Sequence, residues 1–152
     1  MEKPLGYIIG QTKRVYRNKL TAKFKENDVD LSLGLYIIMI QIDLNEAVTQ
    51  QHLADHLQKD KSVVMRQINA LIEKGYVVRS WNKQDKRKKN LVLTPAGQEA
   101  LKLTRSLARS VSKELLSGVD DEDQRIFEHV VQRILENGGS DGNSMLNDKI
   151  KI

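Results

Sequence analysis

The sequence contains no cysteine. This absence excludes disulfides, thiolate metal sites, a cysteine nucleophile and sensing by cysteine oxidation. Long apolar runs are also missing, because the longest, LGLYIIMI from Leu33 to Ile40, is far shorter than the roughly 20 residues of a membrane-spanning helix. The first ten residues, MEKPLGYIIG, lack the basic start and continuous apolar core of an export signal. We therefore expect a cytoplasmic protein.

The sequence also has few motifs that are typical of catalytic or cofactor-binding sites. The sequence has no recognisable combination of serine, histidine and acid and no glycine-rich phosphate loop, so we expect neither an enzyme nor a cofactor. With 152 residues, 39% of them hydrophobic and 30% charged, the chain fits one globular domain. We predict that this domain covers residues 1–136. The glycine-rich, polar stretch 137–152 is predicted to be a flexible tail.

What the sequence does have is a concentrated positive charge. The net charge is +5, and the segment from Arg79 to Asn90 alone accounts for it, with one acid, Asp85, among its bases. Those bases are Arg79, Lys83, Lys86, Arg87, Lys88 and Lys89. Like charges this close repel one another, so the segment favours a partner that supplies negative charge.

The spacing of apolar residues predicts helices before this basic segment. The first covers about 5–24 and the second runs through 35–40, and both are expected to bury apolar side chains. Thr49 and Asp60 are suitable N-cap residues for a short third helix and for a fourth helix over 61–74.

The pattern changes after the fourth helix. Gly75 supplies a helix stop, and residues 76–81 and 91–93 are extended, which predicts a hairpin with a charged tip. Thr94 and Pro95 are typical of the start of another helix. This fifth helix carries apolar residues at four-residue intervals, namely Leu103, Leu107, Val111 and Leu115, and a sixth follows Asp120 with an apolar stripe from Ile126 to Ile134.

A short helix, a turn, a second helix and a basic hairpin form the order of a winged helix-turn-helix. With Val64, Ile68 and Leu71 facing inward, the outer face of the helix over 61–74 holds hydrogen-bonding groups that can contact base edges in a groove. These are Ser62, Arg66 and Asn69, flanked by Val63 and Gln67. A solvated polar face is the alternative, but the adjoining basic hairpin favours DNA.

From about Thr49 to Gly97 the chain resembles the DNA-binding lobe of the multiple antibiotic resistance regulator (MarR) family. The matching stretches are LADHLQKDKSVVMRQINALIEKGYVVR, then Asp85-Lys86-Arg87, then LVLTPAG. The resemblance implies a mainly α fold with a β-hairpin wing, a winged-helix lobe over about 45–97, and dimerisation helices over about 4–26 and 98–136. It also implies a homodimeric transcription regulator, more often a repressor, that binds a pseudo-palindromic operator in double-stranded DNA.

The resemblance also implies roles for individual residues. Ser62, Val63, Arg66 and Gln67 should meet base edges or nearby phosphates, with Lys61 and Asn69 on the same DNA-binding helix. In the wing 82–90, Arg87 should enter the minor groove and Asp85 should hold the wing in shape. Phosphate contacts are expected from Lys83, Lys86, Lys88 and Lys89. Without cysteine, the family leaves regulators that bind a small aromatic or anionic effector, or none, and the pocket residues cannot be named from the sequence.

Other interpretations of the same residues remain open. A non-specific architectural protein could use the basic wing alone, and a winged helix that had lost DNA binding could bind proteins. His52 and His56 have metal-ligand spacing but no local third ligand, so we expect no metal site. The acids Asp120–Asp123 fit helix capping better than cation binding, and Trp81 fits a hairpin side chain that covers the core better than a stacking residue.

Overall fold

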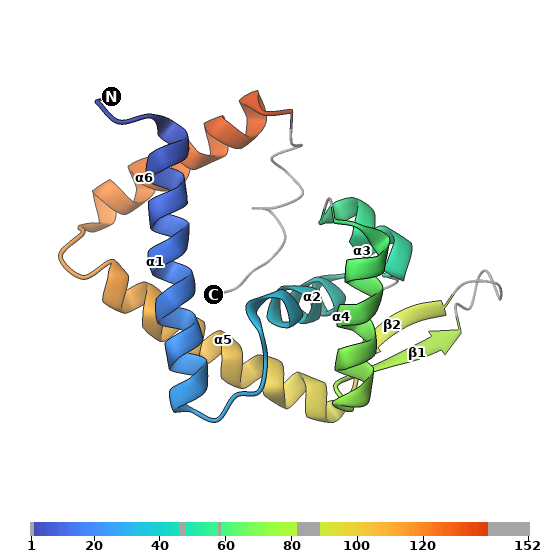
Figure 1. Cartoon of the computed structure of the whole chain (residues 1–152). Coiled ribbons are helices and arrows are strands. Elements are labelled where there is room, and N and C mark those ends of the chain that lie inside the picture. The colour runs from blue at the N-terminus through green and yellow to red at the C-terminus, as the bar shows by residue number, and fades with distance from the viewer. Residues whose placement is uncertain (1, 46–47, 58, 82–88, 140–152) are drawn as a thin grey trace. The chain divides into compact units, whose positions relative to one another are not determined.

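The computed structural model describes residues 2–45, 48–57, 59–81 and 89–139 (Figure 1). These residues form six helices and one antiparallel hairpin, which confirms the predicted mainly helical fold with a β-hairpin wing. The elements are α1 (Leu5–Glu26), α2 (Leu33–Leu44), α3 (Gln50–His56), α4 (Lys61–Glu73), β1 (Val77–Trp81), β2 (Lys89–Leu93), α5 (Pro95–Leu115) and α6 (Asp121–Asn137). No helix in these ranges is both long enough and apolar enough to cross a membrane.

The chain divides into two compact units, Met1–Val111 and Ser112–Ile152, with the boundary inside α5. The predicted domain limits, 1–136 with a tail over 137–152, stay a prediction. From residue 140 onward that tail lies outside the described residues, as does the wing tip 82–88.

The core of the first unit lies where α2, α3, α4 and the hairpin meet (Figure 1). Its centre is formed by fully buried side chains, which include Ile38 and Met39 of α2, Leu53 of α3, Ile68 of α4 and Val77 of β1. The C-terminal part of α1 joins this unit, since Phe24 packs edge-on against Tyr36 of α2 with ring centroids 5.7 Å apart. The helix-turn-helix and the hairpin therefore share one apolar support.

The predicted stop at Gly75 is confirmed as a left-handed turn. Gly75 has φ +73°, and the N–H groups of Gly75 and Tyr76 donate to the carbonyls of Ile72 and Leu71 at 2.9 Å each. These two bonds satisfy carbonyls that the end of α4 would otherwise leave unpaired. The chain leaves this turn directly into β1.

The start of α5 is fastened to the same turn. The Thr94 hydroxyl donates to the carbonyl of Gly75 at 2.6 Å and accepts from the N–H of Gly97 at 3.0 Å. The Thr94 N–H donates to the carbonyl of Tyr76 at 3.0 Å. Gly97 lies so close to that carbonyl that a Cβ there would overlap it. The sequence LTPAG thus joins the end of α4, the base of the hairpin and the beginning of α5.

The buried face of α5 differs from the stripe that four-residue spacing suggested. Leu103 is 46% exposed, whereas Leu101, Thr104 and Ala108 are buried. Steps of four residues drift by about 40° around a helix of 3.6 residues per turn, so Leu103 lies farther from the centre of the buried face than Leu107, which is at its edge. The helix itself is confirmed, and of its four evenly spaced apolar residues Leu103 lies outside the buried face.

The second unit contains α6. Asp120 caps it, because its carboxylate accepts from the N–H of Asp123 at 2.8 Å, so the predicted capping role is confirmed. In the described part of the chain no residue of α6 is buried. Three large apolar side chains of its predicted stripe are exposed in the single chain: Ile126, Phe127 and Val130.

We predict that Gly97→Ala lowers the free energy of unfolding by about 1–3 kcal/mol, the usual cost of overpacking a rigid site. The added Cβ would meet the backbone carbonyl of Tyr76, which cannot rotate away. Urea unfolding of the full chain measures the change. Gly34→Ala is the matched control, because the nearest atom there is the far end of the flexible Gln67 side chain. Equal losses in the two variants would contradict this account of LTPAG.

Candidate nucleic-acid interface

The N-terminus of α4 is fixed by Asp60. Its carboxylate accepts from the Ser62 N–H at 2.7 Å. Hydrogen bonds from Ser62, first from its side chain and then from its backbone, hold the pKa of Asp60 below the ordinary value, and the charge of Arg66 adds to the effect. The carboxylate is therefore ionised at neutral pH and orders the first turn of the helix.

The outer face of α4 is as exposed as DNA contact requires. Lys61, Ser62, Arg66 and Asn69 are all exposed, and Val63 is half-buried at the edge of the face. This placement is the one predicted from periodicity, and the contacts with DNA stay predictions. Met65, which the prediction left out, is also exposed, with 44% of its surface accessible.

Gln67 occupies a position that was not predicted. Its amide packs so closely against Gly34 of α2 that a Cβ on that glycine would overlap the nitrogen, and its Oε1 is buried without a hydrogen-bond partner among the described residues. The side chain therefore fills the space between α4 and α2. Its predicted contact with DNA stays a prediction that requires the amide to leave this position.

Asn69 has a partner on the hairpin. The guanidinium of Arg79 in β1 donates to the Asn69 Oδ1 at 2.8 Å, and both side chains are exposed. Arg79 contributes to the positive charge of the segment from Arg79 to Asn90, but the sequence did not predict it as a DNA-contacting residue. The alternation of side chains along β1 could have predicted this placement, because Arg79 lies two residues after the buried Val77 and therefore on the same face of the strand.

The described part of the wing is the paired base of the hairpin. Trp81 is opposite Lys89 in the antiparallel register, and the Lys89 ammonium lies 4.6 Å from the centre of the indole ring. Trp81 is 63% exposed, so the prediction that it covers the core is wrong. It packs beneath a lysine instead. The other predicted wing residues lie outside the described residues: Lys83, Asp85, Lys86, Arg87 and Lys88.

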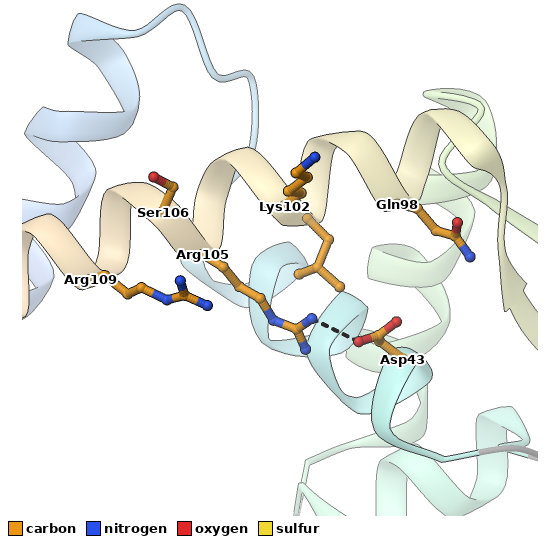
Figure 2. A pocket seen from close by; sticks show the side chains of 7 residues that line it. Asp43, Gln98, Lys102, Arg105, Ser106 and Arg109 are labelled. Atoms are coloured by element: carbon orange, nitrogen blue, oxygen red, sulfur yellow. Dashed lines mark ion pairs between the residues drawn. The ribbon is translucent and has the colours of Figure 1, made fainter. Parts of the chain in front are cut away.

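A cationic hollow of about 660 Å³ lies between α5 and the C-terminal part of α2 (Figure 2). Arg105 pairs with Asp43 at 2.8 Å, and Figure 2 shows Arg109 extending from the next turn of α5. Lys102 and Gln98 also line the hollow. Sequence reasoning did not find this site, because its residues are far apart along the chain and spaced like an ordinary solvated helix face.

Tyr36 lies near these arginines. Burial raises the pKa of its hydroxyl, and Tyr16 adds to the rise, while the positive charges of Arg105 and Arg109 oppose it. Tyr36 is therefore neutral at physiological pH and can donate a hydrogen bond.

The rings of His52 and His56 are in contact on α3. His52 and His56 have centroids 6.5 Å apart and planes nearly perpendicular. Across the described ranges no group of three or more histidine, aspartate or glutamate side chains is arranged to hold a metal ion. The structure therefore gives the histidine pair no further metal ligand within these ranges.

Known proteins resemble this chain in both sequence and fold. Residues 31–89 match the model of the MarR family. The HTH-type transcriptional regulator YybA of Bacillus subtilis is 26% identical over 129 residues, which is 85% of each chain.

Two solved structures share the fold. The MarR protein from Peptoclostridium difficile is 22% identical, with a TM-score of 0.78 over 93% of this chain and 92% of the other. The C80S mutant of Escherichia coli MarR in complex with operator DNA is 22% identical, with a TM-score of 0.76 over 87% and 94%. With the matched lobe, its exposed α4 face and its basic hairpin, this chain belongs to the MarR family of DNA-binding winged helix-turn-helix transcriptional regulators.

Proposed function

We propose that this regulator binds a pseudo-palindromic operator as a homodimer, with α4 in the major groove and the wing in the minor groove. The observation that supports it best is the exposed outer face of α4, whose first turn is fixed by Asp60 and which presents Ser62 and Arg66. An arginine on such a face can form two hydrogen bonds to guanine.

The proposed DNA-binding residues form two groups: those that contact base edges and give sequence specificity, and those that contact phosphates. Ser62, Val63 and Arg66 contact base edges, because side chains near the start of a recognition helix reach deepest into the groove. Lys61 and Lys89 contact phosphates, which strengthens binding to any sequence.

The wing tip completes the interface. Arg87 enters the minor groove, Asp85 keeps the tip in shape, and the neighbouring lysines contact phosphates. The lysines are Lys83, Lys86 and Lys88. These assignments follow from the family resemblance and the charge of the segment.

A second copy of the chain supplies the dimer. In the single chain, α6 exposes Ile126, Phe127 and Val130, and the N-terminal part of α1 exposes Leu5 and Ile9. Clusters of exposed large apolar residues mark interaction surfaces. A two-fold dimer would present two α4 helices to successive major grooves, which accounts for a pseudo-palindromic site.

The regulator acts as a repressor that a small anion releases. Repression needs only occupancy of the operator, which the proposed interface supplies. The cationic hollow supports the effector, because Arg105, Arg109 and Lys102 suit a carboxylate and its volume of about 660 Å³ is typical of small-molecule sites. An aromatic carboxylate fits both the charge and the apolar contact with Leu101.

Arg66→Ala tests the operator contact. We expect it to weaken binding to a duplex selected from a random 30-base-pair pool by about 1–3 kcal/mol, the scale of one specific base contact, with less effect on unselected duplex. Fluorescence anisotropy at fixed salt measures both affinities. A reporter placed behind the selected site should be repressed by the unchanged protein and released by the variant.

The charge-matched control is Arg125→Ala, which removes an exposed arginine that pairs with Glu122 within α6. It should leave the preference for the selected duplex unchanged. If the unchanged protein bound selected and unselected duplexes equally, it would be the non-specific architectural protein and the operator proposal would fail.

Phe127→Glu tests the dimer. A carboxylate in place of a ring that is 60% exposed in the single chain should convert the dimer to monomer, because an unpaired charge buried at an interface costs several kcal/mol. Light scattering with chromatography measures the mass. Glu128→Gln, at the next position of the same helix, is the control and should remain dimeric. A Phe127→Glu protein that stayed dimeric would remove α6 from the interface.

Benzoate tests the effector. We expect it to weaken binding to the selected duplex by about fivefold or more, the lower range of allosteric coupling, whereas benzyl alcohol, which has no charge, has little effect. Arg109→Ala should abolish the response, and Lys113→Ala, which is also on α5 but outside the hollow, should retain it. An Arg109→Ala protein that responded like the unchanged one would place the effector elsewhere.

A further inference from the structure

We propose that Asn69 and Arg79 together hold a DNA backbone phosphate at the edge of the major groove, and that Asn69 positions Arg79 rather than contacting a base. The inference rests on the proposed operator binding by α4. It differs from the expectation drawn from the sequence, in which Asn69 was one of the groups able to contact adenine.

The orientation of the Asn69 amide follows from its partner. A guanidinium can only donate hydrogen bonds, so the atom that faces Arg79 at 2.8 Å must be the amide oxygen. The amide nitrogen is therefore left with its two N–H donors, and Arg79 keeps the donors that it does not use on Asn69. The pair together presents donors and one positive charge.

This set of groups matches a phosphate better than the edge of adenine. Contact with adenine needs an acceptor for the N6 amino group beside a donor for N7, and the amide oxygen of Asn69 has one of its two lone pairs bonded to the charged Arg79 side chain, which fixes the direction of the amide. A phosphate has only acceptor oxygens and a negative charge, so it can accept from both side chains at once. Guanine also presents only acceptors in the major groove, so the position of the pair in the fold decides between guanine and the DNA backbone.

The place of the pair in the fold agrees. Asn69 lies seven residues after Ser62, which is about two turns or 10 Å farther along α4. The N-terminal residues of a recognition helix contact bases, while its later turns lie beside the sugar–phosphate backbone. Arg79 reaches that point from the hairpin, on the strand face that contains Val77 and lies opposite Leu91.

The pair also links two DNA-binding elements. Asn69 belongs to α4 and Arg79 to β1, and beyond their hydrogen bond the hairpin continues to Trp81 and the basic tip. Because Asn69 already holds the guanidinium of Arg79, this side chain loses less conformational entropy on binding a phosphate than an unrestrained arginine does. Asn69 is thus a positioning residue for Arg79.

The test uses the full chain and four variants, Asn69→Ala, Arg79→Ala, Arg79→Lys and the double alanine variant. Two duplexes serve as probes, one selected from a random 30-base-pair pool and one unselected. Affinities are measured over a range of salt concentrations. Thermal unfolding is followed for each variant, and Arg125→Ala controls for the loss of one positive charge.

We expect Arg79→Ala to weaken both duplexes by the same factor and to lower the salt slope by about 1, as the loss of one phosphate contact does. Asn69→Ala should weaken both duplexes by a smaller common factor, and this factor should shrink once Arg79 is alanine, because the two side chains act as a unit. Arg79→Lys should retain the salt slope and lose part of the affinity, since an ammonium cannot hold Asn69 and a phosphate with the same fork.

Repeating the selection of duplexes with the Asn69→Ala protein tests the alternative, in which Asn69 contacts a base. If the preferred sequence changed at one base pair while the salt slope stayed the same, Asn69 would contact a base and the proposal would be overturned. Additive losses in the double variant would also overturn it. Failure of the operator proposal looks different, because the unchanged protein would then show no preference for the selected duplex, while the equal effects of Arg79→Ala on both probes could still be measured.

Discussion

The close approach of Gly97 to the carbonyl of Tyr76 is the constraint on which the DNA-binding lobe depends. Only a residue without a Cβ lets the first turn of α5 lie against the turn after α4, and Thr94 then bonds both Gly75 and Gly97. Three elements are thereby fixed at one point: the end of α4, both strands of the hairpin at their base, and the start of α5. A change in the angle between the base of the hairpin and α4 would disturb these bonds.

Outward from this point the hairpin loses apolar support and gains charge. On one face the pairs in order are Val77 with Leu93, Arg79 with Leu91, and Trp81 with Lys89. Both residues of the first pair are buried. In the second pair Leu91 is buried and Arg79 is exposed. In the third pair the Lys89 ammonium lies over the Trp81 ring. Packing therefore determines the direction of the hairpin at its base, and a cation–π contact holds together Trp81 and Lys89, the last described pair.

Local sequence signals predicted the elements well, because each depends on neighbours in the chain. Caps at Thr49, Asp60 and Asp120 and the stop at Gly75 need only nearby backbone atoms. The errors and omissions involve side chains whose environment is made by distant segments. Gln67 packs on a glycine 33 positions earlier, Arg79 bonds a residue of another element, and Trp81 packs beneath a lysine of the partner strand.

The end of α2 that lines the cationic hollow is followed along the chain by a contact with the wing strand β2. Arg105 holds Asp43 near the end of α2, and a few residues later the carbonyl of Val48 accepts from the N–H of Leu91 in β2 at 2.9 Å. Val48 is buried, so the segment after α2 and the wing strand share one packed position. An anion that pairs with Arg105 competes with Asp43 for the same guanidinium. It can shift the wing only to the extent that it binds more tightly when that ion pair is broken, because a ligand with equal affinity for both arrangements changes neither population.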